Sequence, residues 1–262
     1  MIITGINGYK SFIAKNFLTK FKSKYKILHF KSDINNIKNF KKFTIASNYT
    51  HFIYFAALSR EKCSSNKTLC QQTNFLSVKK TINFLNTLEI KPVFIFISSS
   101  HIYGHSKKRL KESSKKNPKS LYAVLKLKSE NYIKKNYKNS CILRVFNVYG
   151  ENQPSSFFVP DMISKITNNE KIIINKSIRD FLHVSEVSKI IDFIIKKKIL
   201  GTVNVGSGRG LTLKYIIKNI GKHVGIKPRL SENSITDKIV ADISLLKSYG
   251  YIQSKNAKYF NI

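Results

Sequence analysis

The sequence has no tryptophan, three cysteines, and 14 acidic residues against 47 lysines and arginines. Cys63, Cys70 and Cys141 are odd in number and lack metal-ligand spacing, which predicts reduced thiols, no disulfide framework and no metal site. No apolar run approaches the ~18 residues that a membrane span needs, and the start MIIT does not look like a secretory signal. These absences predict a cytoplasmic protein with no membrane partner.

The shortage of acidic residues gives a formal net charge of +33, which by itself favours nucleic acid as a partner. Only six of the cationic residues are arginine, and the lysines are spread along the whole chain and do not form one stripe with interleaved aromatics. We therefore interpret the lysine excess as a compositional bias and expect no nucleic-acid partner. A basic surface would still attract anionic ligands such as nucleotides.

The first residues of the chain predict a phosphate-binding turn. MIITGINGYKS gives a strand, a glycine turn at Gly5 and Gly8, and a helix start, with Ser11 where a third glycine is usual. In this arrangement backbone N–H groups and the positive end of a helix face a pyrophosphate. Serine is small enough for the close packing of helix and strand that the third glycine normally permits.

The next two predicted strands bear on the choice of cofactor. YKILHF is followed by Lys31 and Ser32, where folds that prefer NAD place a carboxylate for the ribose 2′-hydroxyl. We therefore expect NADP, with NAD as the alternative, and Asp33 either faces the adenine or begins a turn. The strand THFIYF then leads into Ala56 and Ala57, small residues that let the backbone approach a ligand closely.

A later stretch holds the strongest catalytic pattern. VFIFI predicts a strand that is covered on both faces, and it ends in a run of serines. Reactive groups of open α/β folds collect at such carboxyl ends. Tyr122 and Lys126 are four residues apart on a helical pattern and so share one face, where an ammonium would favour the phenolate and lower the tyrosine pKa. Taken alone, this spacing is common on ordinary amphipathic helices.

In chain order, a series of segments resembles the successive landmarks of the extended short-chain dehydrogenase/reductase family, which comprises NAD(P)-dependent nucleotide-sugar epimerases, dehydratases and reductases. The segments are TGINGYKS, YFAALSR, Asn74, ISSSHIYG, YAVLK, LRVFNVYG, RDFLHVSEV and VNVGSG. The resemblance implies an α/β fold, with a Rossmann doubly wound parallel sheet over residues 1–150. Residues 177–205 would return to this domain, and 151–262 would form a smaller substrate-binding region. It also implies a nucleotide-sugar substrate and leaves a homodimer open.

The resemblance further implies roles for single residues. Tyr122 would exchange a proton with a sugar hydroxyl or ketone, Ser99 would hold the same oxygen, and Lys126 would bind the nicotinamide ribose. The implied cofactor contacts are Gly5, Asn7, Gly8, Tyr9, Lys31, Ser32, Asp33, Ala56, Ala57, Asn74, Tyr122 and Lys126. The implied substrate contacts are Ser100, Asn147 and Arg179. Without the resemblance, Asn74 is a surface residue, Asn147 caps a turn, and Arg179 pairs with Asp180 or Glu186.

Departures from the family pattern narrow the predicted activity. The 4,6-dehydratases carry an Asp-Glu pair where this chain has Ser100 and His101, so dehydration is not expected. GDP-fucose synthases have an acid/base cysteine at the position of His101 and a second acid/base histidine at that of Phe158. Because the ordinary pKa of histidine is about 6.5, His101 either transfers a proton near neutral pH or only hydrogen-bonds the substrate.

We therefore predict an NADP-dependent oxidoreductase that acts at carbon 4 of a nucleotide-diphosphate sugar, reducing a 4-keto sugar with Tyr122 as acid/base. A nucleotide-sugar 4-epimerase with retained NAD(P) is the alternative. Two other classes stay open, namely a dinucleotide-binding protein without turnover and a basic nucleic-acid-binding protein. The set formed by Ser99, Tyr122 and Lys126 argues against the first, and the dispersed lysines argue against the second.

Overall fold

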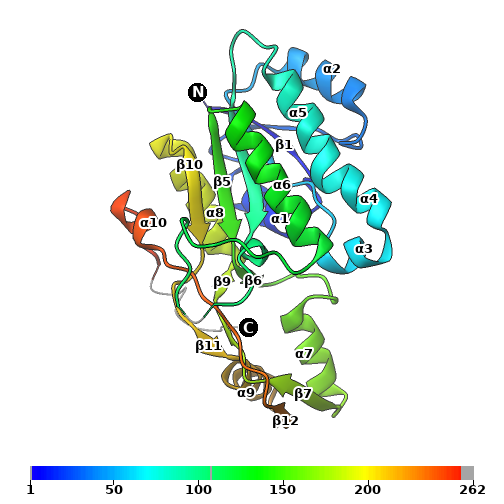
Figure 1. The fold of residues 1–262 in the computed structure, drawn as a ribbon, viewed down its shortest axis with the longest axis vertical. Helices are drawn as coiled ribbons and strands as arrows, with labels where there is room; N and C mark the ends of the chain where they lie inside the picture. Colours follow the sequence, from blue (N-terminus) through cyan, green and yellow to red (C-terminus); the bar gives the residue numbers. More distant parts are fainter. Residues whose placement is uncertain (1, 107, 255–262) are drawn as a thin grey trace.

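The computed structural model describes residues 2–106 and 108–254, which are built around a six-stranded parallel sheet (Figure 1). From one edge to the other its strands are β10 (Gly201–Val205), β5 (Ser140–Val145), β4 (Val93–Ser99), β3 (His51–Tyr54), β1 (Ile3–Asn7) and β2 (Lys26–His29). The chain proceeds from β1 to one edge and then crosses to β3, so the strand order reverses between β1 and β3. This is the predicted doubly wound α/β fold, in which ligands bind outside the carboxyl ends of the strands at the reversal.

Helices cover both faces of this sheet, and all but the last of them lie between its strands along the chain. They are α1 (Phe12–Phe21), α2 (Ile37–Ser47), α3 (Arg60–Ser65), α4 (Lys67–Gln71), the π-helical turn η1 (Gln72–Leu76), α5 (Ser77–Leu85), the 3-10 turn η2 (Ser100–Ile102), α6 (Leu121–Asn136), α8 (Val184–Lys197) and α10 (Ser244–Ser248). Phe17 of α1 and Ile190 of α8 share one core cluster with Ile53 of β3. Phe52 of the same strand packs on the opposite face, where α2, α5 and α6 contribute to a second cluster. Burial on both faces explains the continuous apolar runs of the central strands.

A smaller unit lies beyond the carboxyl ends of the central strands, at the bottom of Figure 1. It contains α7 (Phe158–Thr167), α9 (Leu213–Val224) and the parallel pair β7 (Lys171–Asn175) and β12 (Arg229–Asn233). Met162, Ile172 and Ile216 belong to its separate core. The short strands beside it are β6 (Asn147–Tyr149), β8 (Ile178–Arg179), β9 (Phe181–His183), β11 (Leu211–Thr212) and β13 (Lys238–Ile239). Among the described residues, no helix is long and apolar enough to cross a membrane.

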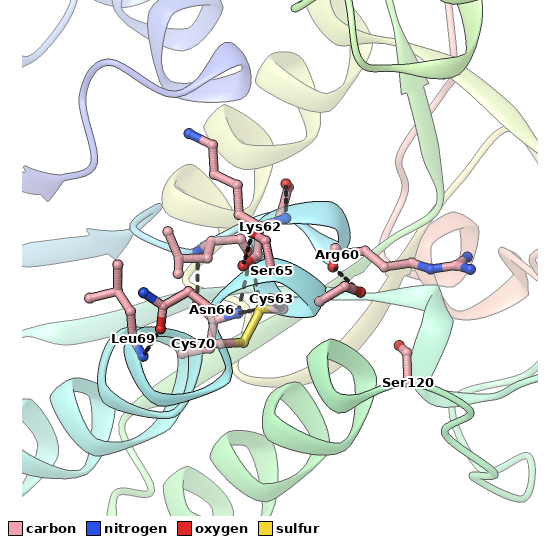
Figure 2. The surroundings of a disulfide bond; sticks show 12 residues. Arg60, Lys62, Cys63, Ser65, Asn66, Leu69, Cys70 and Ser120 are labelled. Carbon is pink, nitrogen blue, oxygen red and sulfur yellow. Dashed lines mark hydrogen bonds between the residues drawn. A yellow bond between two sulfur atoms is a disulfide. The ribbon is translucent and has the colours of Figure 1, made fainter.

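The cysteines differ from the sequence-based expectation, because Cys63 and Cys70 form a disulfide between α3 and α4 (Figure 2). The two short helices meet at Asn66, whose side chain caps α4 by accepting a hydrogen bond from the N–H of Leu69 at 2.8 Å. This reversal of the chain brings the two cysteine Cα atoms within 4.9 Å. The prediction of no disulfide was therefore wrong, while Cys141 is free and buried in β5.

Candidate active site

The turn after β1 fits a phosphate group. Gly8 has a φ of +58°, and a Cβ at this position would lie 2.6 Å from the backbone nitrogen of Ala56, so only glycine fits. Helix α1 begins immediately afterwards, its first turn holds no acidic residue, and its N-cap Ser11 makes no side-chain cap hydrogen bond. The N–H groups at this helix start are thus open to the pyrophosphate of a dinucleotide.

Two buried asparagines hold the loop after β3, which packs against this turn at Ala56. Asn7 Oδ1 accepts hydrogen bonds from the N–H groups of Phe55 (2.8 Å) and Ala56 (3.0 Å), which ties the end of β1 to the loop after β3. Asn74, in η1, accepts from the N–H of Leu58 at 2.8 Å and donates to its carbonyl at 3.1 Å. Asn74 is only 1% exposed, so it is not the surface residue that its sequence context alone indicated. Both side chains hold the backbone beside Ala56 and Ala57.

The sequence pattern predicted that Gly5 lies in the turn. In the structure Gly5 lies within β1. A Cβ at Gly5 would lie 2.7 Å from the ring of Tyr49 and 2.8 Å from that of Phe52. Glycine at this position therefore makes room for two aromatic rings against the sheet. Of the two glycines, Gly8 is the one that lies in the turn. A cofactor contact of Gly5 stays a prediction.

The residues predicted to select the cofactor follow β2. Lys31, Ser32 and Asp33 are exposed. Asp33 begins a turn, one of its two predicted roles, because its Oδ1 accepts hydrogen bonds from the N–H (2.9 Å) and Nδ2 (3.1 Å) of Asn35. The remaining predicted cofactor residue of the glycine turn is Tyr9, which lies against the ring of His29 at the end of β2, with the centroids 5.6 Å apart.

Ser99 and Tyr122 come together at the carboxyl end of β4. Ser99 Oγ accepts a hydrogen bond from the N–H of His101 at 3.3 Å. Burial raises the pKa of Tyr122, the nearby Ser99 side chain lowers it by a smaller amount, and Glu61 adds to the rise. The net pKa shift is upward, opposite to the shift predicted from the Tyr-Lys spacing, because burial outweighs the neighbouring groups. Tyr122 therefore holds its proton at neutral pH.

Lys126 lies one helical turn after Tyr122 and is only 3% exposed. Its Nζ donates a hydrogen bond to the carbonyl of Ile97 at 2.7 Å and is 5.9 Å from the centroid of the Tyr122 ring. Burial lowers the pKa of Lys126 to about 7, while the Glu130 carboxylate opposes this shift. The strand β4 thus fixes the position of the ammonium beside the phenol.

The ring of His101 also lies against that of Tyr122. The two rings meet edge to face, with centroids 6.1 Å apart and an interplanar angle of 85°. Burial lowers the pKa of His101, and the positive charges of Arg60 and Arg179 lower it further, while Glu61 opposes them. A neutral imidazole next to Tyr122 can accept a proton at neutral pH.

The predicted substrate contacts have other partners in the structure. The guanidinium of Arg179 forms a bidentate pair with Asp237, at 2.6 and 2.7 Å, and so pairs with neither Asp180 nor Glu186. Asn147 does not cap a turn; its Nδ2 donates to the carbonyl of Asp180 at 2.9 Å. Ser100 is buried in η2. Substrate contacts of Ser100, Asn147 and Arg179 stay predictions.

Comparison with known proteins assigns this chain to a family. Residues 2–206 match the sequence model of the NAD dependent epimerase/dehydratase family, and this match covers more than half of the chain. The chain belongs to the NAD dependent epimerase/dehydratase family. The match spans the glycine turn, the end of β4, α6 and the Arg179 segment, so all of the predicted site residues lie within the family region.

The individual relatives of this family member have low sequence identity to it. "Uncharacterized UDP-glucose epimerase YtcB" of Bacillus subtilis (strain 168) is 29% identical over 161 residues, covering 58% of this chain and 50% of that protein. GDP-6-deoxy-D-talose 4-dehydrogenase of Aggregatibacter actinomycetemcomitans is 32% identical over 128 residues, covering 46% and 44%. The chain thus spans about half the length of these curated relatives. The structure of a dTDP-4-dehydrorhamnose reductase from Bacillus anthracis str. Ames in complex with NADP shares the fold, with a TM-score of 0.86, 18% identity and coverage of 97% and 94%.

Three residues near the site of this epimerase/dehydratase family member were missed by the sequence analysis. Arg60 and Glu61 begin α3 and act electrostatically on His101. In Figure 2 the Arg60 side chain extends away from the disulfide that anchors the same helix. Their signal was their place at the start of the first helix that follows the carboxyl end of β3. His29 was detectable in the same way, because it ends β2.

Proposed function

We propose that the protein is an NADP-dependent reductase that acts on the ketone at carbon 4 of a nucleotide-diphosphate sugar. The observation that carries this proposal is the buried Tyr122 beside Ser99, because burial raises the pKa of Tyr122 and the phenol therefore keeps its proton. A buried acid that is protonated at neutral pH is suited to give a proton to a ketone oxygen. Family membership and the relative that is named as a 4-dehydrogenase support this assignment.

In the proposed reaction, NADPH would supply, when bound, the hydride that reduces carbon 4. Tyr122 donates its phenolic proton to the ketone oxygen, so that the C=O bond becomes a secondary alcohol. Ser99 holds the same oxygen by a hydrogen bond. The protonated form of Lys126, which is partly populated at neutral pH because its pKa is about 7, is held by the carbonyl of Ile97 and stabilises the phenolate that remains. We further propose that residues 1–150 with 177–205 bind the dinucleotide and that 151–262 bind the sugar nucleotide, consistent with the separate core of the smaller unit.

Turnover of a panel of nucleotide sugars and their 4-keto forms, with NADPH and NADH compared, tests the proposed function. We expect a 4-keto sugar to oxidise NADPH, and calorimetry to show tighter binding of NADPH than of NADH, because Lys31 and Ser32 follow β2 without a neighbouring carboxylate at the ribose position. Interconversion of 4-hydroxy sugars without net loss of NADPH would instead identify a 4-epimerase. Equal affinity, or tighter NADH, would show that Lys31 is only a surface lysine.

We also expect His101 to remove a proton from a carbon beside the ketone. In deuterated water the protein with a 4-keto substrate should incorporate deuterium at that carbon, and His101→Ala should abolish the exchange. Because burial, Arg60 and Arg179 lower the pKa of His101, exchange should weaken only as the pH falls below 6.5. Reduction without any exchange in the wild-type protein would leave a plain 4-keto reductase and make His101 a binding residue.

A further inference from the structure

The end of β2 carries a histidine where many dinucleotide-binding folds carry an acid. In those folds an Asp or Glu about 20 residues after the glycine turn accepts a hydrogen bond from the ribose 2′-hydroxyl. Here β2 ends at His29, so His29 lies at this strand end together with Lys31 and Ser32, which follow it. In the parallel register of the sheet His29 lies beside Ile6 of β1, two residues before Gly8. Its ring packs on Tyr9, the residue that follows Gly8, so it lies at the mouth of the dinucleotide turn.

The charged groups around His29 are mainly cationic. Burial lowers the pKa of His29, and the charge of Lys31, which follows at the same strand end, lowers it further. On the opposite side, Lys10 Nζ lies 5.8 Å from the centroid of the Tyr9 ring that packs on His29. The acidic residue that follows β2, Asp33, uses its Oδ1 to accept two hydrogen bonds from Asn35. Protonation of His29 adds a further positive charge beside Lys31 and Lys10, so it is favoured only when an anion binds near these cations.

We propose that His29, in its protonated form, determines cofactor specificity by binding the 2′-phosphate of NADP together with Lys31. This inference rests on the proposed use of NADP and assigns a residue to its selection. A carboxylate at this position would repel the phosphate, whereas an imidazolium donates a charge-assisted hydrogen bond to it. Tyr9 holds the imidazole ring at the turn, which reduces the freedom that the side chain would lose on binding.

Protonation of His29 couples the binding of NADPH to the uptake of a proton. Free His29 has a pKa below its ordinary value and is neutral at pH 7.5. A phosphate dianion beside the ring favours the charged imidazolium and raises that pKa, so binding of NADPH takes up a proton. NADH lacks the 2′-phosphate and should take up none at this site. Each unit by which the phosphate raises the pKa corresponds to about a tenfold gain in affinity at low pH.

Calorimetric titration of the full chain at pH 7.5, in buffers of different ionisation enthalpy, counts the protons that accompany binding. We expect fractional proton uptake with NADPH and none with NADH. His29→Gln should abolish the uptake and weaken NADPH about tenfold, with NADH unchanged. Lys31→Gln is the matched control, because it should weaken NADPH but retain the uptake. His29→Asp should reverse the preference towards NADH, which tests the position by a gain of binding.

Identical proton uptake in the wild type and His29→Gln would overturn the inference, as would a His29→Asp variant that still prefers NADPH. The 2′-phosphate itself titrates, but that contribution persists in His29→Gln and is removed by the comparison. Failure of the proposed function is a separate result. Absence of turnover with every 4-keto sugar, together with His29-dependent proton uptake on NADPH binding, would reject the reaction and retain the role of His29.

Discussion

Tyr122→Phe is expected to lower turnover of a 4-keto nucleotide sugar by about 10²–10⁴-fold, the usual contribution of a general acid. The change removes one hydroxyl from a side chain that packs beside Leu125 and the Cys63–Cys70 disulfide, and the phenylalanine ring retains that packing. Binding of nucleotide sugar and dinucleotide should therefore stay close to that of the wild type. Steady-state kinetics combined with calorimetric binding separates the two effects.

Tyr132→Phe is the matched control for this prediction. Tyr132 lies on the same helix α6, and its hydroxyl donates a hydrogen bond to Asn83. Like Tyr122→Phe, this variant removes one hydroxyl group from α6. It leaves Ser99 and Lys126 unchanged, so turnover should be retained. If Tyr122→Phe kept a near-normal rate, the proton would be transferred by another group, and the assignment of the site at the end of β4 would fail.

The sequence was sufficient for the parts of the fold that depend on local pattern. Continuous apolar runs marked β3 and β4, and the strand, glycine and helix signals marked the turn at Gly8. Because parallel strands end at one edge of a sheet, the serines after β4 could be expected near that turn. The proximity of Ser99, Tyr122 and His101 follows from this topology together with the helical spacing on α6.

Other features depended on contacts that sequence spacing does not encode. Asp237 pairs with Arg179 across 58 positions of the chain, and no local pattern identifies such a partner. The disulfide depends on the way α3 and α4 meet at Asn66. The direction of the Tyr122 pKa shift was also missed, because a neighbouring lysine can be recognised from its spacing but the extent of burial cannot.

A buried ion pair below the site gives the largest expected effect on stability. Arg144 of β5 and Glu130 of α6 are both 0% exposed, with Nη2 2.7 Å from Oε2. Ser98, which precedes Ser99, donates to Glu130 Oε1 at 2.6 Å, and the hydroxyl of Tyr103 accepts from Arg144 at 2.8 Å. The pair therefore links β4, α6 and β5 next to Ser99, a predicted catalytic residue.

Arg144→Met should lower the free energy of unfolding by about 3–5 kcal/mol, because it removes the fully buried cation and leaves the Glu130 carboxylate with the Ser98 hydroxyl and the half-exposed Lys134, 3.7 Å away. Urea denaturation followed by circular dichroism measures the loss. The double variant Glu130→Leu/Arg144→Met removes both charges, and we expect it to recover most of the stability, since paired burial of charges often breaks even with apolar packing. A double variant no more stable than Arg144→Met would show that the loss arises from the shape and other hydrogen bonds of the arginine, and not from an unpaired buried charge.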